Sequence, residues 1–191
     1  MARQCSFDRE EVLERAMELF WTRGYEATSV ANLVEHLGIN RFSLYNSFGD
    51  KKRLYHLCLR HYLASHSRPK LLPLLGEGAG LKEIEAFLHQ MAQDARPGLG
   101  CFVQSALLER RQLDEQVAKL SDEVFDGLHQ ALKQALERAR SRGELRQTAD
   151  PDTLAHWLVL QIQGIRVLLR AGQAERVIPA LTQIVTLLHQ Q

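Results

Sequence analysis

The chain has 191 residues, of which 45% are hydrophobic and 25% charged, and its formal net charge is +1. This composition indicates an ordered globular protein that buries a sizeable core, and it excludes an intrinsically disordered chain. No apolar run reaches the roughly 18 residues that a membrane span needs, so we expect a cytoplasmic protein without a membrane partner.

The first two predicted helices have clear boundary residues. Asp8 can cap a helix whose apolar residues recur at helical spacing until Gly24. Thr28 is expected to cap a short second helix that ends at Gly38, since glycine readily adopts the backbone geometry of a helix end.

A short turn connects the second predicted helix to a third. Gly38-Ile39-Asn40 forms the turn, and Asn40 is suited to cap a helix over residues 41–48. Asp50 then caps a fourth helix that should end before Pro69. This arrangement of two short helices around a tight turn predicts a helix-turn-helix.

The segment from Pro69 to Gly80 contains two prolines and three glycines and is therefore predicted to be a hinge or loop. We accordingly predict a head over residues 1–50, a connecting helix over 51–68 and a C-terminal domain over 69–191. Further helices are predicted at 81–95, 101–112, 114–142, 152–171 and 175–189, and no strand pattern competes with them. Because an internal proline costs a helix about 3 kcal/mol, Pro179 predicts a kink or a start nearer Val177.

Positive charge is concentrated in one stretch. Residues 39–70 carry seven Lys and Arg but only one acid, Asp50. A basic stretch over a helix-turn-helix is typical of a surface that binds nucleic acid, although a solvated basic helix face would have the same composition.

The run from Thr28 to Leu54, TSVANLVEHLGINRFSLYNSFGDKKRL, resembles the signature of the TetR family, and the resemblance extends over residues 7–62. Phe42 departs from the family pattern, which usually has a small residue there. The resemblance implies an all-α protein with a three-helix helix-turn-helix DNA-binding head and a C-terminal helical domain for ligand binding and dimerisation. It also implies a repressor that leaves its DNA site when an effector binds.

The third predicted helix would enter the DNA major groove. A helical wheel places Leu44 and Phe48 on the inner face, so that neighbouring side chains face the groove. The predicted DNA-binding residues are Thr28, Asn40, Arg41, Phe42, Ser43, Tyr45, Asn46, Lys51 and Lys52. Among them, Thr28 and Lys51 match phosphate-contact positions of the family, while Phe42 and Tyr45 could instead be packing residues.

The resemblance implies a homodimer, because one helix reads few bases and paired heads read two half-sites of a palindromic operator in double-stranded DNA. The last two helices would form the interface as a four-helix bundle. The predicted interface residues are Leu154, Leu158, Ile162, Ile165, Leu169, Leu181, Ile184 and Leu188.

Three cysteines, Cys5, Cys58 and Cys101, are widely spaced and are expected to be free thiols. Cys101 follows a Pro-Gly-Leu-Gly run at the start of a predicted helix, where the helix terminus would stabilise a thiolate. Its Gly-Cys-Phe context resembles TetR-type repressors that sense electrophiles through a cysteine, whereas a small buried hydrophobe is the alternative. Cys58 is expected to be a core residue.

The predicted contacts of a small-molecule effector are Cys101, Phe102, Gln104, Trp157, Gln161 and Arg166. The polar and aromatic positions on the helix of Trp157 could equally form a polar strip at an interface.

No catalytic or metal site is predicted. His89, His129 and His189 lie on separate predicted helices without metal-ligand spacing. Ser105 has acidic residues nearby but no nucleophile elbow or oxyanion loop. We therefore expect no cofactor, no metal and no enzymatic activity, and the alternative to an effector-released repressor is a TetR-like structural or cell-division protein that binds DNA without a ligand.

Overall fold

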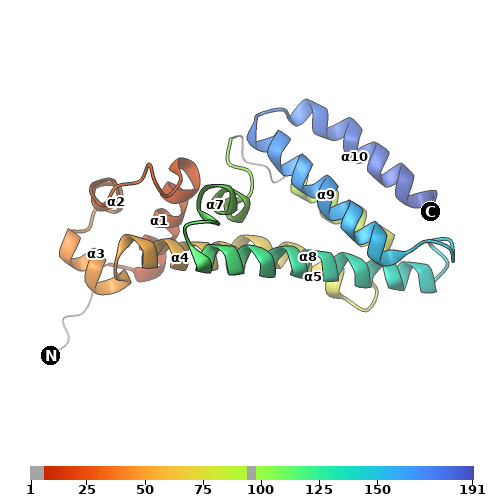
Figure 1. Ribbon diagram of the computed structural model, residues 1–191, viewed down its shortest axis with the longest axis horizontal. Helices are drawn as coiled ribbons and strands as arrows, with labels where there is room; N and C mark the ends of the chain where they lie inside the picture. Colours follow the sequence, from red (N-terminus) through yellow and green to blue (C-terminus); the bar gives the residue numbers. More distant parts are fainter. Residues whose placement is uncertain (1–6, 94–97) are drawn as a thin grey trace. The chain divides into compact units, whose positions relative to one another are not determined.

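The computed structural model describes residues 7–93 and 98–191, and within these residues the regular secondary structure is entirely helical (Figure 1). The all-α prediction is confirmed. Cys5, Pro97 and the last two residues of the predicted helix 81–95 lie outside the described residues.

The chain folds into two compact units. The N-terminal unit comprises Met1–Ser67 with Phe102–Lys119, and the C-terminal unit comprises Arg68–Cys101 with Leu120–Gln191. A segment from the middle of the chain therefore folds with the N-terminal helices, which the linear division at residue 69 does not include.

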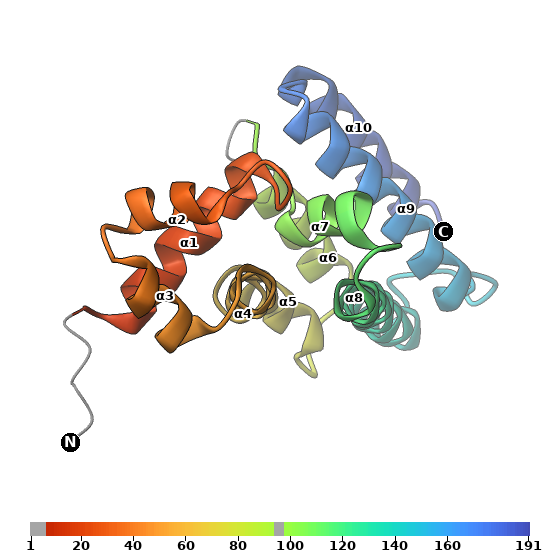
Figure 2. The same cartoon turned by 60° about the vertical axis from the view of Figure 1, so that its left-hand side comes forward.

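The N-terminal unit begins with four helices, α1 (Arg9–Arg23), α2 (Val30–Leu37), α3 (Arg41–Phe48) and α4 (Lys51–Tyr62). α1 packs against both α2 and α4, and α2 packs against α3 (Figure 2). Three of the four predicted caps are present: Asp8 caps α1, Asn40 caps α3 and Asp50 caps α4. Gly38 ends α2 with a φ of 67°, a left-handed geometry that lets the chain turn directly into α3.

Aromatic side chains form much of this unit's core. The Tyr55 ring lies 5.0 Å from Phe20 and 5.7 Å from Phe102, while Trp21 lies 4.9 Å from Tyr62, all as ring-centroid distances in edge-to-face contacts. Phe102 is the first residue of α7 (Phe102–Arg110) and is only 1% exposed. Phe102, which was predicted as an effector contact, packs α7 onto the N-terminal helices.

The chain remains helical beyond α4, where a loop was predicted. A π-helical turn, Leu63–Ser67, leads into α5 (Arg68–Leu75), so the irregular segment is confined to residues 76–80. Pro69 is the second residue of α5, close to the end of the π turn, where the hydrogen-bond register changes and a missing backbone N–H costs little.

The C-terminal unit contains α6 (Leu81–Gln93), α9 (Pro151–Arg170), α10 (Ala174–His189) and most of α8 (Glu115–Ser141). α6 packs against α9 and α10, which also pack against each other. α10 begins at Ala174, earlier than the proline-based prediction, and contains Pro179 at an exposed position. No helix within the described residues is both long and apolar enough to cross a membrane.

The predicted dimer residues occupy this unit's own core, so their assignment is corrected. These side chains pack against other helices of the same chain and are therefore not on the surface of α9 and α10. Seven of the eight are less than 9% exposed: Leu158, Ile162, Ile165, Leu169, Leu181, Ile184 and Leu188. The eighth, Leu154, is half-buried against the same core.

Candidate nucleic-acid interface

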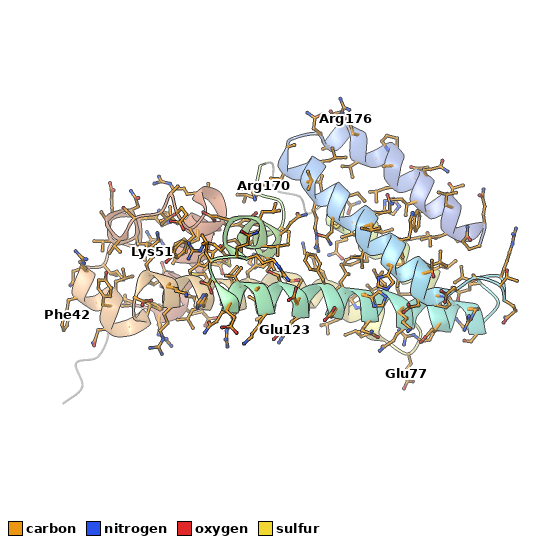
Figure 3. The ribbon with its side chains drawn as sticks, in the orientation of Figure 1. Phe42, Lys51, Glu77, Glu123, Arg170 and Arg176 are labelled. Carbon is orange, nitrogen blue, oxygen red and sulfur yellow. The ribbon has the colours of Figure 1, made fainter. Side chains whose placement is uncertain are left out.

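α3 has one buried face and one exposed face. Leu44 and Phe48 are 2% and 1% exposed, as the helical wheel predicts. Phe42 is 79% exposed and projects away from the helix (Figure 3), and Asn46, four residues later, is exposed on the same side. The exposed face of a helix that follows a tight turn after another short helix is the surface that a helix-turn-helix presents to DNA, so this face is a candidate contact surface.

Tyr45 and Arg41 lie together beside this surface. The Arg41 guanidinium lies 5.5 Å from the centroid of the Tyr45 ring, and its Nη2 donates to the Tyr45 hydroxyl at 3.4 Å. Tyr45 is 37% exposed, which differs from the packing role considered above. At the start of the helix, Asn40 Oδ1 accepts a hydrogen bond from the Ser43 backbone N–H at 2.8 Å. Asn40 therefore has a capping role, and Ser43 is half-buried.

Thr28 is not a surface residue, so both its predicted capping role and its predicted phosphate contact are corrected. It is fully buried, and its hydroxyl donates to the Gly24 carbonyl oxygen at 2.7 Å. Ser29 caps α2 instead: its Oγ accepts from the Asn32 backbone N–H, and Asn32 Oδ1 accepts from the Ser29 backbone N–H. The exposed hydroxyl next to the helix-turn-helix is therefore that of Ser29.

The basic start of α4 offers further cations. Lys51 is half-buried with its Nζ 4.0 Å from the centroid of the Tyr25 ring, and burial lowers the pKa of Lys51. Lys52 and Arg53 are exposed and line an open pocket of about 480 Å³ that His56 and Arg60 also border. Arg53 and Arg60 were not among the predicted contacts, although the charge of residues 39–70 pointed to this region.

The C-terminal end of α7 braces the turn between α1 and α2. The Glu109 carboxylate accepts hydrogen bonds from the backbone N–H groups of Tyr25 and Glu26 at 2.9 and 2.8 Å. Arg110 pairs with Glu26, and its guanidinium lies 4.3 Å from the centroid of the Tyr25 ring. Gly24 has a φ of 84°, and a Cβ there would lie 3.0 Å from Glu109 Oε1, so this approach favours glycine. This brace, which the sequence did not predict, fixes the entry to α2.

Asp114 forms a second connection, between α4 and the start of α8. This carboxylate is 2% exposed and lies 2.8 Å from His56 Nε2 and 3.6 Å from Lys52 Nζ. Burial acts to raise the pKa of Asp114, but the hydrogen bond with His56 and the nearby positive charges outweigh it and hold the pKa below its usual value. Asp114 is therefore ionised at neutral pH.

The predicted effector contacts are divided between the two units. Cys101, 8% exposed, directly precedes α7, and Gln104 is half-buried on α7. Trp157, Gln161 and Arg166 are half-buried on α9.

Cys58 is fully buried in the N-terminal unit, as predicted for a core thiol. Burial raises the pKa of Cys58 well above its usual value, so this thiol stays protonated at neutral pH.

Comparisons with known proteins cover both units. The family model for bacterial regulatory proteins of the tetR family matches residues 12–58, and the model for the tetracyclin repressor-like C-terminal domain matches residues 81–184. The uncharacterized HTH-type transcriptional regulator YezE of Bacillus subtilis (strain 168) is 30% identical over 162 residues, covering 83% of this chain and 84% of the relative. The HTH-type transcriptional repressor ComR of Escherichia coli (strain K12) is 29% identical over 170 residues, covering 87% and 81%.

Solved structures agree with this assignment. The TetR family transcriptional regulator CifR, a cysteine mutant complexed with a 26-bp double-strand operator DNA, has a TM-score of 0.84 at 27% identity and covers 97% of this chain and 98% of its own. The reduced form of NemR from E. coli has a TM-score of 0.77 at 26% identity, covering 93% and 95%. The chain belongs to the TetR family of bacterial transcriptional regulators.

Proposed function

We propose that this protein is a dimeric repressor that binds a palindromic operator through α3 and leaves it when an effector binds. The observation that carries the proposal is the exposed face of α3, where Phe42 and Asn46 project from a helix whose opposite face is buried in the head. The relative CifR, which has the same fold, is complexed with a double-strand operator DNA, and this supports DNA binding by the present chain. Such a regulator would act in the cytoplasm, where bacterial DNA lies.

We assign sequence reading to α3 and positioning to the surrounding cations. Asn46 can pair bidentately with adenine, and the Phe42 ring can contact a thymine methyl group. Lys52 and Arg53 are exposed at the start of α4 and would contact backbone phosphates, which fix the register without reading bases. Lys51, held over Tyr25, would help to orient this end of α4 and would reach a phosphate only by leaving that ring.

We place the dimer interface on the outward faces of α9 and α10. Leu160 and Val167 are 70% and 51% exposed. With Gly164 between them they occupy positions i, i+4 and i+7, and so share one face of α9. Gly164 lacks a side chain and would let a partner helix approach closely. On α10, Ile178 is 68% exposed. Two copies joined through these helices would form a four-helix bundle and present two heads to DNA.

Release would act through α7. This helix starts directly after Cys101 and ends in the Glu109 brace on the turn before α2, so a displacement of α7 would disturb the helix-turn-helix. Two sensing routes are compatible with this connection: modification of Cys101 by an electrophile, or binding of a small molecule along Trp157, Gln161 and Arg166. The CifR structure of a cysteine mutant and the NemR structure of a reduced form favour testing the thiol first.

Sequencing the DNA that the purified protein selects from a random library tests the proposal. We expect a palindrome whose half-sites are centred about 34–36 Å apart, or a multiple of this spacing, because each head reads one turn of the major groove. The Asn46→Ala variant should lose the enrichment, and the Gln112→Ala variant, changed at an exposed position outside the helix-turn-helix, should keep it. Enrichment of no sequence, or of a sequence that Asn46→Ala selects equally well, would contradict the proposal.

A further inference from the structure

Three metal-ligating side chains meet in the C-terminal unit. His129 comes from α8, and Asp152 and His156 lie four residues apart on one face of α9. His129 Nε2 is 3.5 Å from Asp152 Oδ1, and His156 Nε2 is 3.7 Å from Asp152 Oδ2. One ligand atom from each of the three residues lies within 4.8 Å of the others.

These separations suit a common metal ion. Zinc binds imidazole nitrogen and carboxylate oxygen at about 2.0–2.1 Å, so two ligands at tetrahedral positions are about 3.3–3.4 Å apart. The nitrogen–oxygen distances of 3.5 and 3.7 Å exceed this value by a few tenths of an ångström, and they reach different oxygens of Asp152, Oδ1 from His129 and Oδ2 from His156. Small side-chain rotations would therefore bring all three ligands onto one ion.

One possible metal ligand of the cluster makes no hydrogen bond. His129 Nε2 is buried, and among the described residues it has no hydrogen-bond partner. Its 3.5 Å separation from Asp152 Oδ1 is an ion-pair contact without hydrogen-bond geometry, and metal coordination would satisfy this nitrogen more fully. The imidazole rings of His129 and His156 stack with their centroids 4.1 Å apart, which keeps the two nitrogen ligands together.

Lys133 is the competing cation. Its Nζ lies 2.9 Å from Asp152 Oδ1, and this hydrogen bond is the main reason that the pKa of Asp152 is lowered. A Lys133–Asp152 ion pair needs neither histidine, so it does not account for the convergence of the two imidazoles. Because the Lys133 ammonium binds the same carboxylate, it should compete with a metal ion and weaken its binding.

We propose that His129, Asp152 and His156 bind one divalent transition-metal ion of the zinc type, linking α8 to the start of α9. Imidazole nitrogen with a single carboxylate favours zinc, nickel or copper over magnesium and calcium, which prefer oxygen ligands. His156 is exposed, so the ion has a path from solvent. All three ligands lie in the C-terminal unit, outside the helix-turn-helix.

Titration of the full-length, metal-stripped protein with zinc chloride, followed by calorimetry, tests the site. We expect one zinc ion per chain with a micromolar Kd, and no heat from magnesium chloride under the same conditions. His156→Gln should weaken zinc binding by about a hundredfold or more, since even the loss of residues that only orient metal ligands costs about 10- to 100-fold. His89→Gln, which changes an exposed histidine on α6, is the matched control and should leave the affinity unchanged.

The effect of Lys133→Gln on zinc affinity distinguishes a metal site from a cluster with only a structural role. Removing the competing ammonium should tighten zinc binding severalfold, opposite to the effect of His156→Gln. Circular dichroism of each variant confirms that it is folded. The proposal is overturned if zinc does not bind saturably, if His156→Gln and His89→Gln have equal affinities, or if Lys133→Gln weakens zinc binding.

Discussion

Glu109→Ala should selectively loosen the turn that precedes α2. The substitution removes an acceptor shared by two backbone N–H groups, those of Tyr25 and Glu26. A hydrogen bond to a charged group contributes about 1.5–3 kcal/mol, and since one of these two is solvent-exposed we expect a total loss of about 2–4 kcal/mol. With a urea slope of about 2 kcal/mol per molar, this corresponds to a midpoint lowered by about 1–2 M for the N-terminal unit.

Urea unfolding followed by circular dichroism measures the loss, and hydrogen exchange locates it. The amides of Tyr25 and Glu26 should lose protection in Glu109→Ala, while amides in the middle of α9 should not. Leu108→Ala changes the neighbouring residue, which is 77% exposed, and should alter stability by less than about 0.5 kcal/mol. If Glu109→Ala were no more destabilising than Leu108→Ala, the brace would not hold the turn.

Other substitutions test separate parts of the molecule. Tyr55→Phe should raise the free energy of unfolding by about 1 kcal/mol in thermal melts, because the buried hydroxyl has no hydrogen-bond partner among the described residues; a clear loss of stability would contradict this. Because the pKa of Asp114 is lowered in the fold, this carboxylate stabilises the protein fully above the unfolded carboxyl pKa of about 4, and the stabilisation is lost as the pH falls through the lowered pKa. Asp114→Asn should therefore reduce the pH dependence of unfolding below about pH 4. If the pH dependence of unfolding below about pH 4 were unchanged in this variant, other carboxylates would be responsible for it. Leu160→Glu should convert the dimer into a monomer in light scattering, and a persistent dimer would place the interface elsewhere. Cys101→Ser should bind the operator normally yet resist release by an electrophile, and release like that of the unmodified protein would favour a noncovalent effector.

The helices and the exposed face of α3 could be predicted because their signals are local. Capping residues such as Asn40 and the helical spacing of Leu44 and Phe48 determine where α3 begins and which side is buried. The choice between Thr28 and Ser29 could not be made in this way. Both are good capping residues, and the hydrogen bond from the Thr28 hydroxyl to Gly24 decides between them.

The missed features depend on contacts between distant segments. An apolar stripe on α9 predicts that residues such as Leu158 are buried, but the stripe does not say whether the same chain or a partner buries them. Glu109 and Tyr25 are 84 residues apart, and no local pattern connects them. The sequence analysis did not predict the cluster of His129, Asp152 and His156, because His129 on α8 meets the two residues of α9 only in the folded chain.

We propose that α3 reads bases while the start of α4 positions the protein on phosphate. Fluorescence anisotropy on the selected operator and on random DNA, over a range of salt concentrations, tests this division most directly. Asn46→Ala should weaken operator binding by about 1–3 kcal/mol with little effect on random DNA. Lys52→Ala should weaken both similarly and reduce the salt slope by about two per symmetric dimer. If Asn46→Ala kept full discrimination between operator and random DNA, α3 would not be the element that reads the sequence.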